Sequence, residues 1–192
     1  GADSGDVFIN STSLQDHPIE AKMRIGYLPD SPQLSEDQTP EDALTLAAQL
    51  RHVDSSQIKH KVSSMMEMLS LGEVAGRRIG ALSKGFKQRI ALSQALIHDP
   101  DTLVLDEPTD GLDPSQLVLI RKIIKELSEK HTILMSSHNL QEVETLCSSI
   151  VIIDQGSIVE QGPCERVLAR NSDQCQYLVK VIEKPVLFAQ RL

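Results

Sequence analysis

Two adjacent carboxylates follow a short apolar run in the middle of the chain. Residues 102–105 read Thr-Leu-Val-Leu, too few for a helix, and Asp106 and Glu107 come directly after them. A buried parallel strand presents acidic groups in this way at the crevice beyond its carboxyl end. One carboxylate there can hold a Mg²⁺, directly or through its water shell, and its neighbour can polarise an attacking water. An ordinary solvated loop after a strand is the alternative interpretation.

A candidate anion site precedes this pair, at Ser83, Lys84 and Gly85. Ser and Gly at these positions are typical of the start of a helix. Such a helix would carry an apolar stripe of Ile90, Ala91, Ala95 and Leu96. Free backbone N–H groups and the positive end of the helix dipole attract anions at a helix start, and Lys84 adds a full positive charge. The pattern therefore favours phosphate binding.

The order of these motifs resembles that of ABC-type ATPase subunits. Residues 82–89, LSKGFKQR, resemble the signature motif of that family, and residues 102–107, TLVLDE, resemble its Walker B motif. Residues 111–114, GLDP, resemble the D-loop, and His138, after two serines, matches the switch histidine. Four motifs in the family's order make the resemblance highly specific.

The resemblance implies roles for the residues of a hydrolytic site. Asp106 would order the Mg²⁺, and Glu107 would be the general base or the residue that positions the attacking water. His138 would contact the terminal phosphate and hold that water in place. Its position just past a second buried strand would bring it to the same crevice as Glu107. Without the resemblance, His138 would be interpreted as a surface histidine or one with satisfied hydrogen bonds.

The resemblance also implies that two subunits share each nucleotide. Ser83, Lys84 and Gly85 would cap the terminal phosphate of an ATP bound to the other subunit, and Asp113 would cross the dimer interface. Asp113 is also a candidate N-cap for a helix that begins at Pro114, and the two roles are compatible. Hydrolysis would then need a dimer.

A calcium-binding loop is the competing metal hypothesis for the segment after residue 105. Asp106, Asp110 and Gly111 match positions one, five and six of that motif. Its third position is Pro108 and its twelfth is Leu117, which cannot be a bidentate ligand. Calcium is therefore rejected in favour of Mg²⁺.

A second candidate metal ligand is Asp30, in a polar loop after a strand expected over residues 23–29. Related ABC subunits have Gln, or sometimes Glu, at the corresponding position, and this residue touches the metal and senses the transmembrane partner. Asp is shorter by one methylene, which limits its reach. A solvated turn is the alternative.

The phosphate loop that completes such a site is not found in the 192 residues. That loop reads G-x-x-x-x-G-K-[ST], and its backbone and Lys cradle the phosphates. Residues 80–85 have two glycines at the right spacing but no Lys-Ser/Thr pair after the second. Residues 4–9, SGDVFI, resemble the family's strand beyond its first nucleotide-binding helix, so we expect the loop to precede Gly1 in a longer protein. The alternative is a degenerate protein that has lost the loop.

Strands alternate with helices along the chain, which predicts an α/β fold with a mostly parallel sheet. The resemblance implies a three-layer, RecA-like P-loop NTPase core with an inserted helical subdomain, truncated at its N-terminus. Residues 1–34 would be a remnant of the N-terminal part of the core, and residues 35–98 the helical subdomain, which ends in the signature helix. Residues 99–170 would form the core with Walker B, D-loop and switch histidine. Residues 171–192 would form a C-terminal extension.

Local signals predict most of the individual elements. Thr39 and Asp54 are candidate N-caps of two helices, and Gly72 is the expected end of the second. That helix has an apolar face of Ile58, Val62, Met65, Met66 and Leu69, which we assign to core packing rather than to a pliable partner-binding surface. Further helices are expected from Pro114 and over residues 140–147. Strands are expected over residues 6–9, 131–135, 150–153, 157–160, 176–182 and 186–189.

Composition limits the classes of function. The chain has 19 basic and 27 acidic residues, a net charge of −8, which argues against broad nucleic-acid binding. Cys147, Cys164 and Cys175 lack metal-ligand spacing and cannot all pair internally, which favours a reducing compartment. No apolar run approaches about 18 residues, so no membrane span is expected.

These observations predict the ATP-binding subunit of an ABC transporter. A homodimer or heterodimer of such subunits would bind and hydrolyse ATP with Mg²⁺ and drive a transmembrane permease. Lys84 and Phe86 replace the commoner Gly and Gln of the signature, as in ABC-2 type exporters, so the direction would be export. The protein would be cytoplasmic and held peripherally on the inner face of the cell membrane, and the chain without a phosphate loop would be inactive alone. The alternative is a regulatory or interaction module, or a degenerate ABC protein, that does not hydrolyse ATP.

Overall fold

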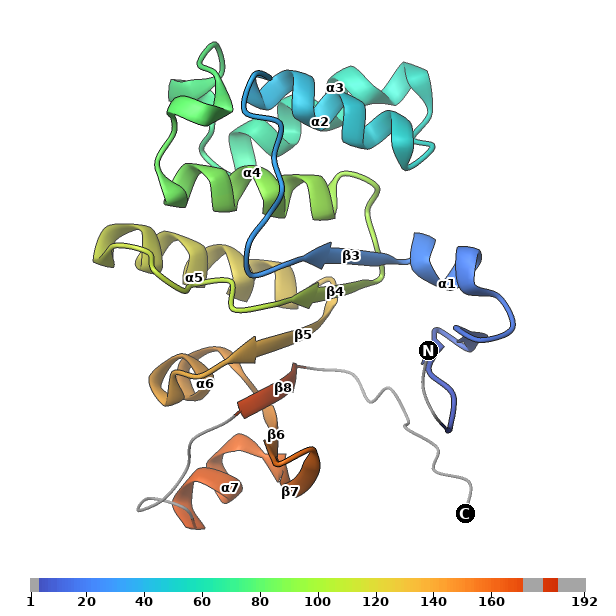
Figure 1. Cartoon of the computed structure of the whole chain (residues 1–192), viewed down its shortest axis with the longest axis vertical. Helices are drawn as coiled ribbons and strands as arrows, with labels where there is room; N and C mark the ends of the chain where they lie inside the picture. Colours follow the sequence, from blue (N-terminus) through green and yellow to red (C-terminus); the bar gives the residue numbers. More distant parts are fainter. Residues whose placement is uncertain (1–3, 171–177, 183–192) are drawn as a thin grey trace.

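The computed structural model describes residues 4–170 and 178–182. Its main sheet consists of β3 (Ile25–Leu28), β4 (Thr102–Leu105), β5 (Thr132–Ser137), β6 (Ser149–Asp154), β7 (Ser157–Pro163) and β8 (Leu178–Ile182). Among the described residues the spatial order of these strands is β3-β4-β5-β8-β6-β7. The helices of the expected helical subdomain gather beyond β3 at one end of the molecule (Figure 1).

Most strands of the sheet run in one direction. β3, β4 and β5 pair in parallel. β8 is antiparallel to both β5 and β6, so β6 runs in the same direction as β5, and β7 returns beside β6 as a hairpin. The predicted α/β fold with a parallel sheet is therefore confirmed. The strand expected over residues 176–182 is present as β8, inside the core sheet, whereas the strand expected over residues 186–189 lies outside the described residues.

The register of the central strands places their carboxyl ends side by side. Leu105 is paired with Leu28 on one side and with Met135 on the other. All three side chains are buried in the main core, which anchors this register. The backbone N–H of Asp106 donates to the carbonyl of Leu28 at 2.8 Å, so the pairing extends one residue past β4. The residues that follow each strand therefore emerge at one edge.

The helical subdomain is formed by α2 (Pro40–Leu50), α3 (Ser55–Met68) and α4 (Lys84–Leu96). Thr39 caps α2 and forms a reciprocal capping box with Asp42, and the carboxylate of Asp54 accepts from Ser56 N–H at the start of α3. Both predicted N-caps are confirmed. The interpretation of the methionine face as core is also confirmed, because Met65 and Met66 pack against buried residues of two core clusters.

The prediction that α3 ends at Gly72 is wrong, because the helix ends at Met68. Ser70 adopts the left-handed conformation, with φ of 51°, and Leu71 N–H donates back to the carbonyl of Met66 at 2.8 Å. The buried guanidinium of Arg89 in α4 donates to the carbonyls of Leu69 and Ser70 at 2.9 and 2.8 Å. These tertiary hydrogen bonds stabilise an earlier end than the glycine signal indicated.

The remaining elements lie outside the main sheet. They are the hairpin β1 (Phe8–Ile9) and β2 (Thr12–Ser13), the helices α1 (Pro18–Met23), α5 (Pro114–Ser128), α6 (Leu140–Leu146) and α7 (Cys164–Arg170), and the 3₁₀ turns η1 (Gly72–Val74) and η2 (Ile79–Ala81). α5 and α6 were predicted, while α1, β2 and α7 were not. β7 extends three residues beyond its predicted end at residue 160.

At Gly26 in β3 the helix α4 packs closely against the sheet. A Cβ atom there would lie 2.3 Å from the carbonyl oxygen of Ala95 and 2.7 Å from Cδ2 of Leu103. Gly26→Ala is therefore expected to lower the free energy of unfolding by roughly 1–3 kcal/mol, because backbone must shift to admit the methyl group. Denaturant titration measures this, with Gly72→Ala as the control, since nothing lies within 4 Å of a Cβ there. Equal stabilities of the two variants would contradict this close approach.

Candidate active site

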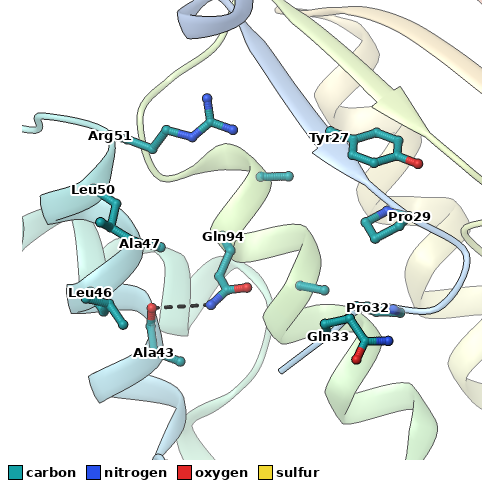
Figure 2. A pocket seen from close by; sticks show the side chains of 12 residues that line it. Tyr27, Pro29, Pro32, Gln33, Ala43, Leu46, Ala47, Leu50, Arg51 and Gln94 are labelled. Atoms are coloured by element: carbon teal, nitrogen blue, oxygen red, sulfur yellow. Dashed lines mark hydrogen bonds between the residues drawn. The ribbon is translucent and has the colours of Figure 1, made fainter. Parts of the chain in front are cut away.

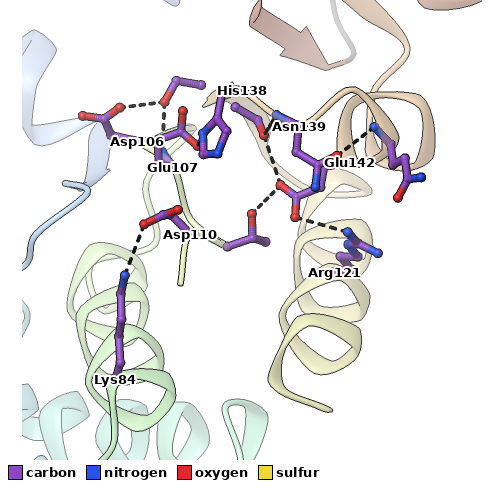
Figure 3. A network of polar contacts seen from close by, with 12 residues as sticks. Lys84, Asp106, Glu107, Asp110, Arg121, His138, Asn139 and Glu142 are labelled. Carbon is purple, nitrogen blue, oxygen red and sulfur yellow. Dashed lines mark hydrogen bonds and ion pairs between the residues drawn. The ribbon is translucent and has the colours of Figure 1, made fainter. Parts of the chain in front are cut away.

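The candidate site lies at the carboxyl ends of β4 and β5. Asp106 and Glu107 follow β4, and His138 follows β5 directly. Because Leu105 and Met135 are paired in the sheet, both sets of residues emerge at the same edge. Figure 3 shows Asp106, Glu107 and His138 grouped above the starts of the neighbouring helices. The structure thus brings His138 to Glu107, which lies 31 residues earlier in the sequence.

Glu107 and His138 are in direct contact. Nδ1 of His138 lies 2.9 Å from Oε2 of Glu107, with a ring N–H donating to the carboxylate. The hydrogen bond and the charge of Glu107 raise the pKa of His138 above its ordinary value; the slight burial of the ring opposes this, and Asp110 and Glu142 add smaller favourable effects. The side chain of His138 is 63% exposed and that of Glu107 25%, so a ligand can reach the pair from solvent. This arrangement can orient a water that approaches the pair from solvent.

Ser136 holds the Asp106 carboxylate and the Glu107 backbone in position. Its Oγ donates to Oδ1 of Asp106 at 2.6 Å and accepts from the backbone N–H of Glu107 at 2.9 Å. Glu107 has a positive φ of 45°, which is uncommon for a residue with a side chain. This conformation costs of order 1–3 kcal/mol, so it persists only where the surrounding structure imposes it. The hydrogen bond from Glu107 to Ser136 helps to impose it. Sequence reasoning missed Ser136, although its position two residues before His138 was a signal.

A second polar network lies behind the pair. Its centre is Glu142 of α6, whose carboxylate contacts Thr109, Ser137 and Arg121. These residues come from the loop after β4, the end of β5 and the middle of α5, and Figure 3 shows Glu142 facing Arg121. None of them was identified from the sequence, because their pairing depends on how the elements pack.

The predicted anion site occupies the start of α4. Ser83 is the N-cap, although its hydrogen bond from Phe86 N–H is long at 3.5 Å. Ser83 and Lys84 are exposed, whereas Gly85 is buried and a Cβ there would lie 2.8 Å from the side chain of Gln116. A larger residue at position 85 would therefore require the side chain of Gln116, in the first turn of α5, to move.

Lys84 connects this helix start to the loop after β4. Its Nζ lies 3.3 Å from Oδ2 of Asp110, and both side chains are about half exposed. Gln88, one turn along α4, donates from Nε2 to the carbonyl of Pro108 at 3.2 Å. The signature segment is thus attached to the same loop that carries Glu107.

Asp113 is the N-cap of α5, as predicted. Its carboxylate accepts from the backbone N–H groups of Ser115 and Gln116, both at 3.0 Å, and from Ser115 Oγ at 2.6 Å. Its hydrogen bonds with Ser115 and Gln116 lower the pKa of Asp113 below its ordinary value, so the side chain is ionised at neutral pH. The side chain is exposed at the surface, which is compatible with the dimer contact that was also expected.

Asp30 lies in the loop after β3, at the same edge of the sheet as Asp106. It is exposed, and its Oδ2 accepts from Ser31 Oγ at 3.2 Å. No cluster of three or more His, Cys, Asp or Glu suited to a metal occurs among the described residues. Hard carboxylate oxygens nevertheless suit Mg²⁺, which keeps most of its ligands as water and substrate phosphate and takes one or two from the protein. Two carboxylates, Asp106 and Asp30, are therefore enough protein ligands for a candidate Mg²⁺ site of this kind.

Comparison with known proteins gives a consistent result. The profile of the ABC transporter family matches residues 1–110. The ABC transporter ATP-binding protein NatA of Bacillus subtilis (strain 168) is 32% identical over 177 residues, which cover 91% of this chain and 72% of NatA. The Nod factor export ATP-binding protein I of Ralstonia nicotianae (strain ATCC BAA-1114 / GMI1000) is 32% identical, covering 83% of this chain and 50% of that protein. The linearmycin resistance ATP-binding protein LnrL of B. subtilis (strain 168) is 33% identical, covering 83% and 53%.

A solved structure is similar along most of the fold. It is described as the structure of an ATP-binding subunit of an ABC transporter, and the superposition has a TM-score of 0.73 at 27% identity, covering 85% of this chain and 69% of that one. The chain spans about half of the length of the Nod factor export protein and of LnrL. Within the part of the chain that the structure describes, every helix is too short or too polar to cross a membrane.

Proposed function

Because this chain belongs to the ABC transporter family of ATP-binding proteins, we propose that it is the hydrolytic part of a transporter's ATPase subunit. In this proposal, ATP binding and hydrolysis in a subunit dimer drive export by a membrane permease of the ABC-2 type. The observation that carries the proposal is the 2.9 Å contact between Glu107 and His138 at the edge where β4 and β5 end. A base and an imidazole so placed suit the attack of water on a phosphate.

In the proposed reaction, each residue of the pair has a separate task. Glu107 orients the attacking water and accepts its proton, a contribution of about 10²–10⁴-fold in rate for a well-placed general base. One ring N–H of His138 is bonded to Glu107, and the raised pKa of His138 favours a proton on the other ring nitrogen, which donates to the terminal phosphate. Phosphoryl transfer needs little covalent chemistry from the protein, so positioning and charge stabilisation supply most of the acceleration.

Asp106 and Asp30 are the proposed metal ligands. When bound with the nucleotide, Mg²⁺ would neutralise charge on the phosphate oxygens. Ser136 Oγ donates to Oδ1 of Asp106 and orients this carboxylate, which would hold the metal directly or through its water shell. This explains why Asp106 and Glu107, although adjacent, have different tasks.

The start of α4 is proposed to act on the nucleotide of a second subunit. Ser83 and Lys84 are exposed at a helix N-terminus, where backbone N–H groups and the helix dipole favour an anion. Lys84 is paired with Asp110 in the isolated chain, so a phosphate would compete with that carboxylate for the ammonium group. Asp113, exposed at the start of α5, is the proposed contact across the interface.

A groove beside β3 supports the proposed permease partner. It has a volume of about 400 Å³, and Figure 2 shows it between β3 with its following loop and the helices α2 and α4. Tyr27, Leu46 and Leu50, all exposed, lie along it, and Gln94 Nε2 donates to the carbonyl of Ala43 at 3.3 Å, which fastens α4 to α2. Exposed apolar side chains around a concavity are typical of protein-docking sites. The proposed location is therefore the inner face of the cell membrane, through the permease.

The test of the proposed function compares two proteins. One is the 192-residue chain, and the other is the same chain fused behind a strand and helix that carry the G-x-x-x-x-G-K-[ST] loop. The chain alone is expected to bind ATP weakly and to hydrolyse almost none, whereas the fused protein does both, as measured by calorimetry and phosphate release. Equal hydrolysis rates would show that the missing loop is not what limits the chain.

The second candidate function is a regulatory or interaction module that does not hydrolyse ATP. In that case the fused protein would bind ATP and remain as slow as the chain alone.

A further inference from the structure

Glu142 is a buried acidic side chain that the proposed reaction does not use. It lies in the first turn of α6 and is 3% exposed. A buried carboxylate is costly unless it is hydrogen-bonded and paired with a cation, so its partners indicate its role.

The contacts of Glu142 come from both sides of the candidate active site. Its Oε2 accepts from Thr109 Oγ1 and from Ser137 Oγ, the latter at 3.1 Å. Its Oε1 lies 3.2 Å from Nη2 of Arg121 in α5, which supplies the compensating charge. Thr109 and Ser137 are themselves 4% and 2% exposed, so neither hydroxyl has bulk water as an alternative partner.

The two hydroxyls that Glu142 binds lie close in sequence to the two residues of the candidate pair. Thr109 is two residues after Glu107, and Ser137 directly precedes His138. A single carboxylate oxygen therefore fastens together the loop that carries the base and the strand end that carries the imidazole. Ser136 joins the same two segments on the other side of the pair, through Asp106 and the Glu107 N–H. The separation of Glu107 and His138 is thus fixed from both sides.

We propose that Glu142 is a positioning residue, which sets the distance between Glu107 and His138 by holding Thr109 and Ser137 on one oxygen. The effect of this positioning on catalysis rests on the proposed function. The positioning itself does not, because its hydrogen bonds are present in the chain alone. Arg121 orients the carboxylate of Glu142, since it binds the other oxygen. Loosening either hydroxyl would let the two loops move apart.

The titration of the His138 ring reports this distance without any turnover. Three acidic groups raise the pKa of His138: Glu107 in contact, and Asp110 and Glu142 more weakly. Removing Glu142 would therefore lower that pKa through charge alone. A Glu142 variant would therefore not distinguish the loss of charge from a longer distance between Glu107 and His138. Thr109→Val does, because it keeps all three carboxylates and nearly the same side-chain volume while it removes one hydroxyl that Glu142 holds.

The experiment follows the His138 ring by NMR as a function of pH in the 192-residue chain, with the His138→Gln spectrum to assign its signal. In Thr109→Val and in Ser137→Ala the pKa of His138 is expected to fall towards its ordinary value, because the contact with Glu107 lengthens. Thr145→Val, on the exposed side of α6, is the matched control and should leave it unchanged. An unchanged pKa of His138 in both hydroxyl variants, with the fold retained, would overturn the proposal.

A second readout separates positioning from simple stability. In a protein that includes the phosphate loop, Thr109→Val is expected to lower kcat about tenfold to a hundredfold with little change in KM, because misplacement of about 1 Å costs up to about 10²-fold. Thr109→Ser restores the hydroxyl and should restore kcat. If turnover is absent in every variant while the pKa of His138 still falls, the positioning role stands and the proposed function fails.

Discussion

Replacing Glu107 with glutamine is expected to slow ATP hydrolysis by about 10²–10⁴-fold in a subunit that includes the phosphate loop, while ATP binding is retained. Glutamine has nearly the shape of glutamate and can still accept a hydrogen bond from His138, but its amide cannot accept a proton from water. The positive φ of residue 107 and its N–H bond to Ser136 involve only the backbone, so the variant should keep the local fold. Single-turnover phosphate release and calorimetric ATP affinity measure the two effects separately.

The same variant should also accumulate a closed dimer. If hydrolysis is what reopens the dimer, blocking the proton transfer leaves two subunits joined around bound ATP. Light scattering with ATP and Mg²⁺ would detect a doubling of mass that the wild-type protein shows only transiently. Glu129→Gln, at an exposed position after α5, makes the same chemical change away from the site and should behave as wild type. A normal rate of ATP hydrolysis in Glu107→Gln would show that Glu107 is not the general base.

Predictions from the sequence succeeded where the interactions that determine a structural feature lie within one short segment. Thr39, Asp54 and Asp113 were recognised as N-caps because each precedes the N–H groups to which it binds by only two or three residues. The strand before Asp106 was recognisable because a four-residue apolar run is too short for a helix, and carboxylates at its end are typical of a buried parallel strand. These local patterns were sufficient to bring Glu107 and His138 to one edge of a sheet.

Sequence reasoning failed where the cause lies in another part of the chain. α3 ends before Gly72 because Arg89, in a different helix, bonds the carbonyls of Leu69 and Ser70. The hydrogen bonds from Ser136 to Asp106 and from Thr109 to Glu142 join residues about thirty positions apart, and they depend on the register of β4 against β5. A one-residue slip would turn those side chains to the opposite face. The proximity of Glu107 and His138 was therefore predictable from the sequence, while the residues that hold their segments in place were not.

If two subunits share each ATP, two different inactive variants should restore activity when they are mixed. Ser83→Asp keeps a good N-cap for α4 but places a negative charge where the proposed site receives the partner's terminal phosphate, so this variant alone should lose hydrolysis. Ser83→Asn keeps the cap without the charge and is the matched control, expected to retain most activity. Glu107→Gln alone is inactive for the reason given above.

In a mixed dimer of the Ser83→Asp and Glu107→Gln subunits, one of the two sites receives an intact Glu107 from the first subunit and an intact Ser83 from the second. Half of the dimers are mixed when equal amounts exchange freely, and each has one good site of two, so the mixture should recover about one quarter of the wild-type rate in a homodimer. Phosphate release before and after subunit exchange measures the recovery. A mixture as inactive as its components would mean that each α4 acts on the nucleotide of its own subunit, which would remove the physical basis for a shared site.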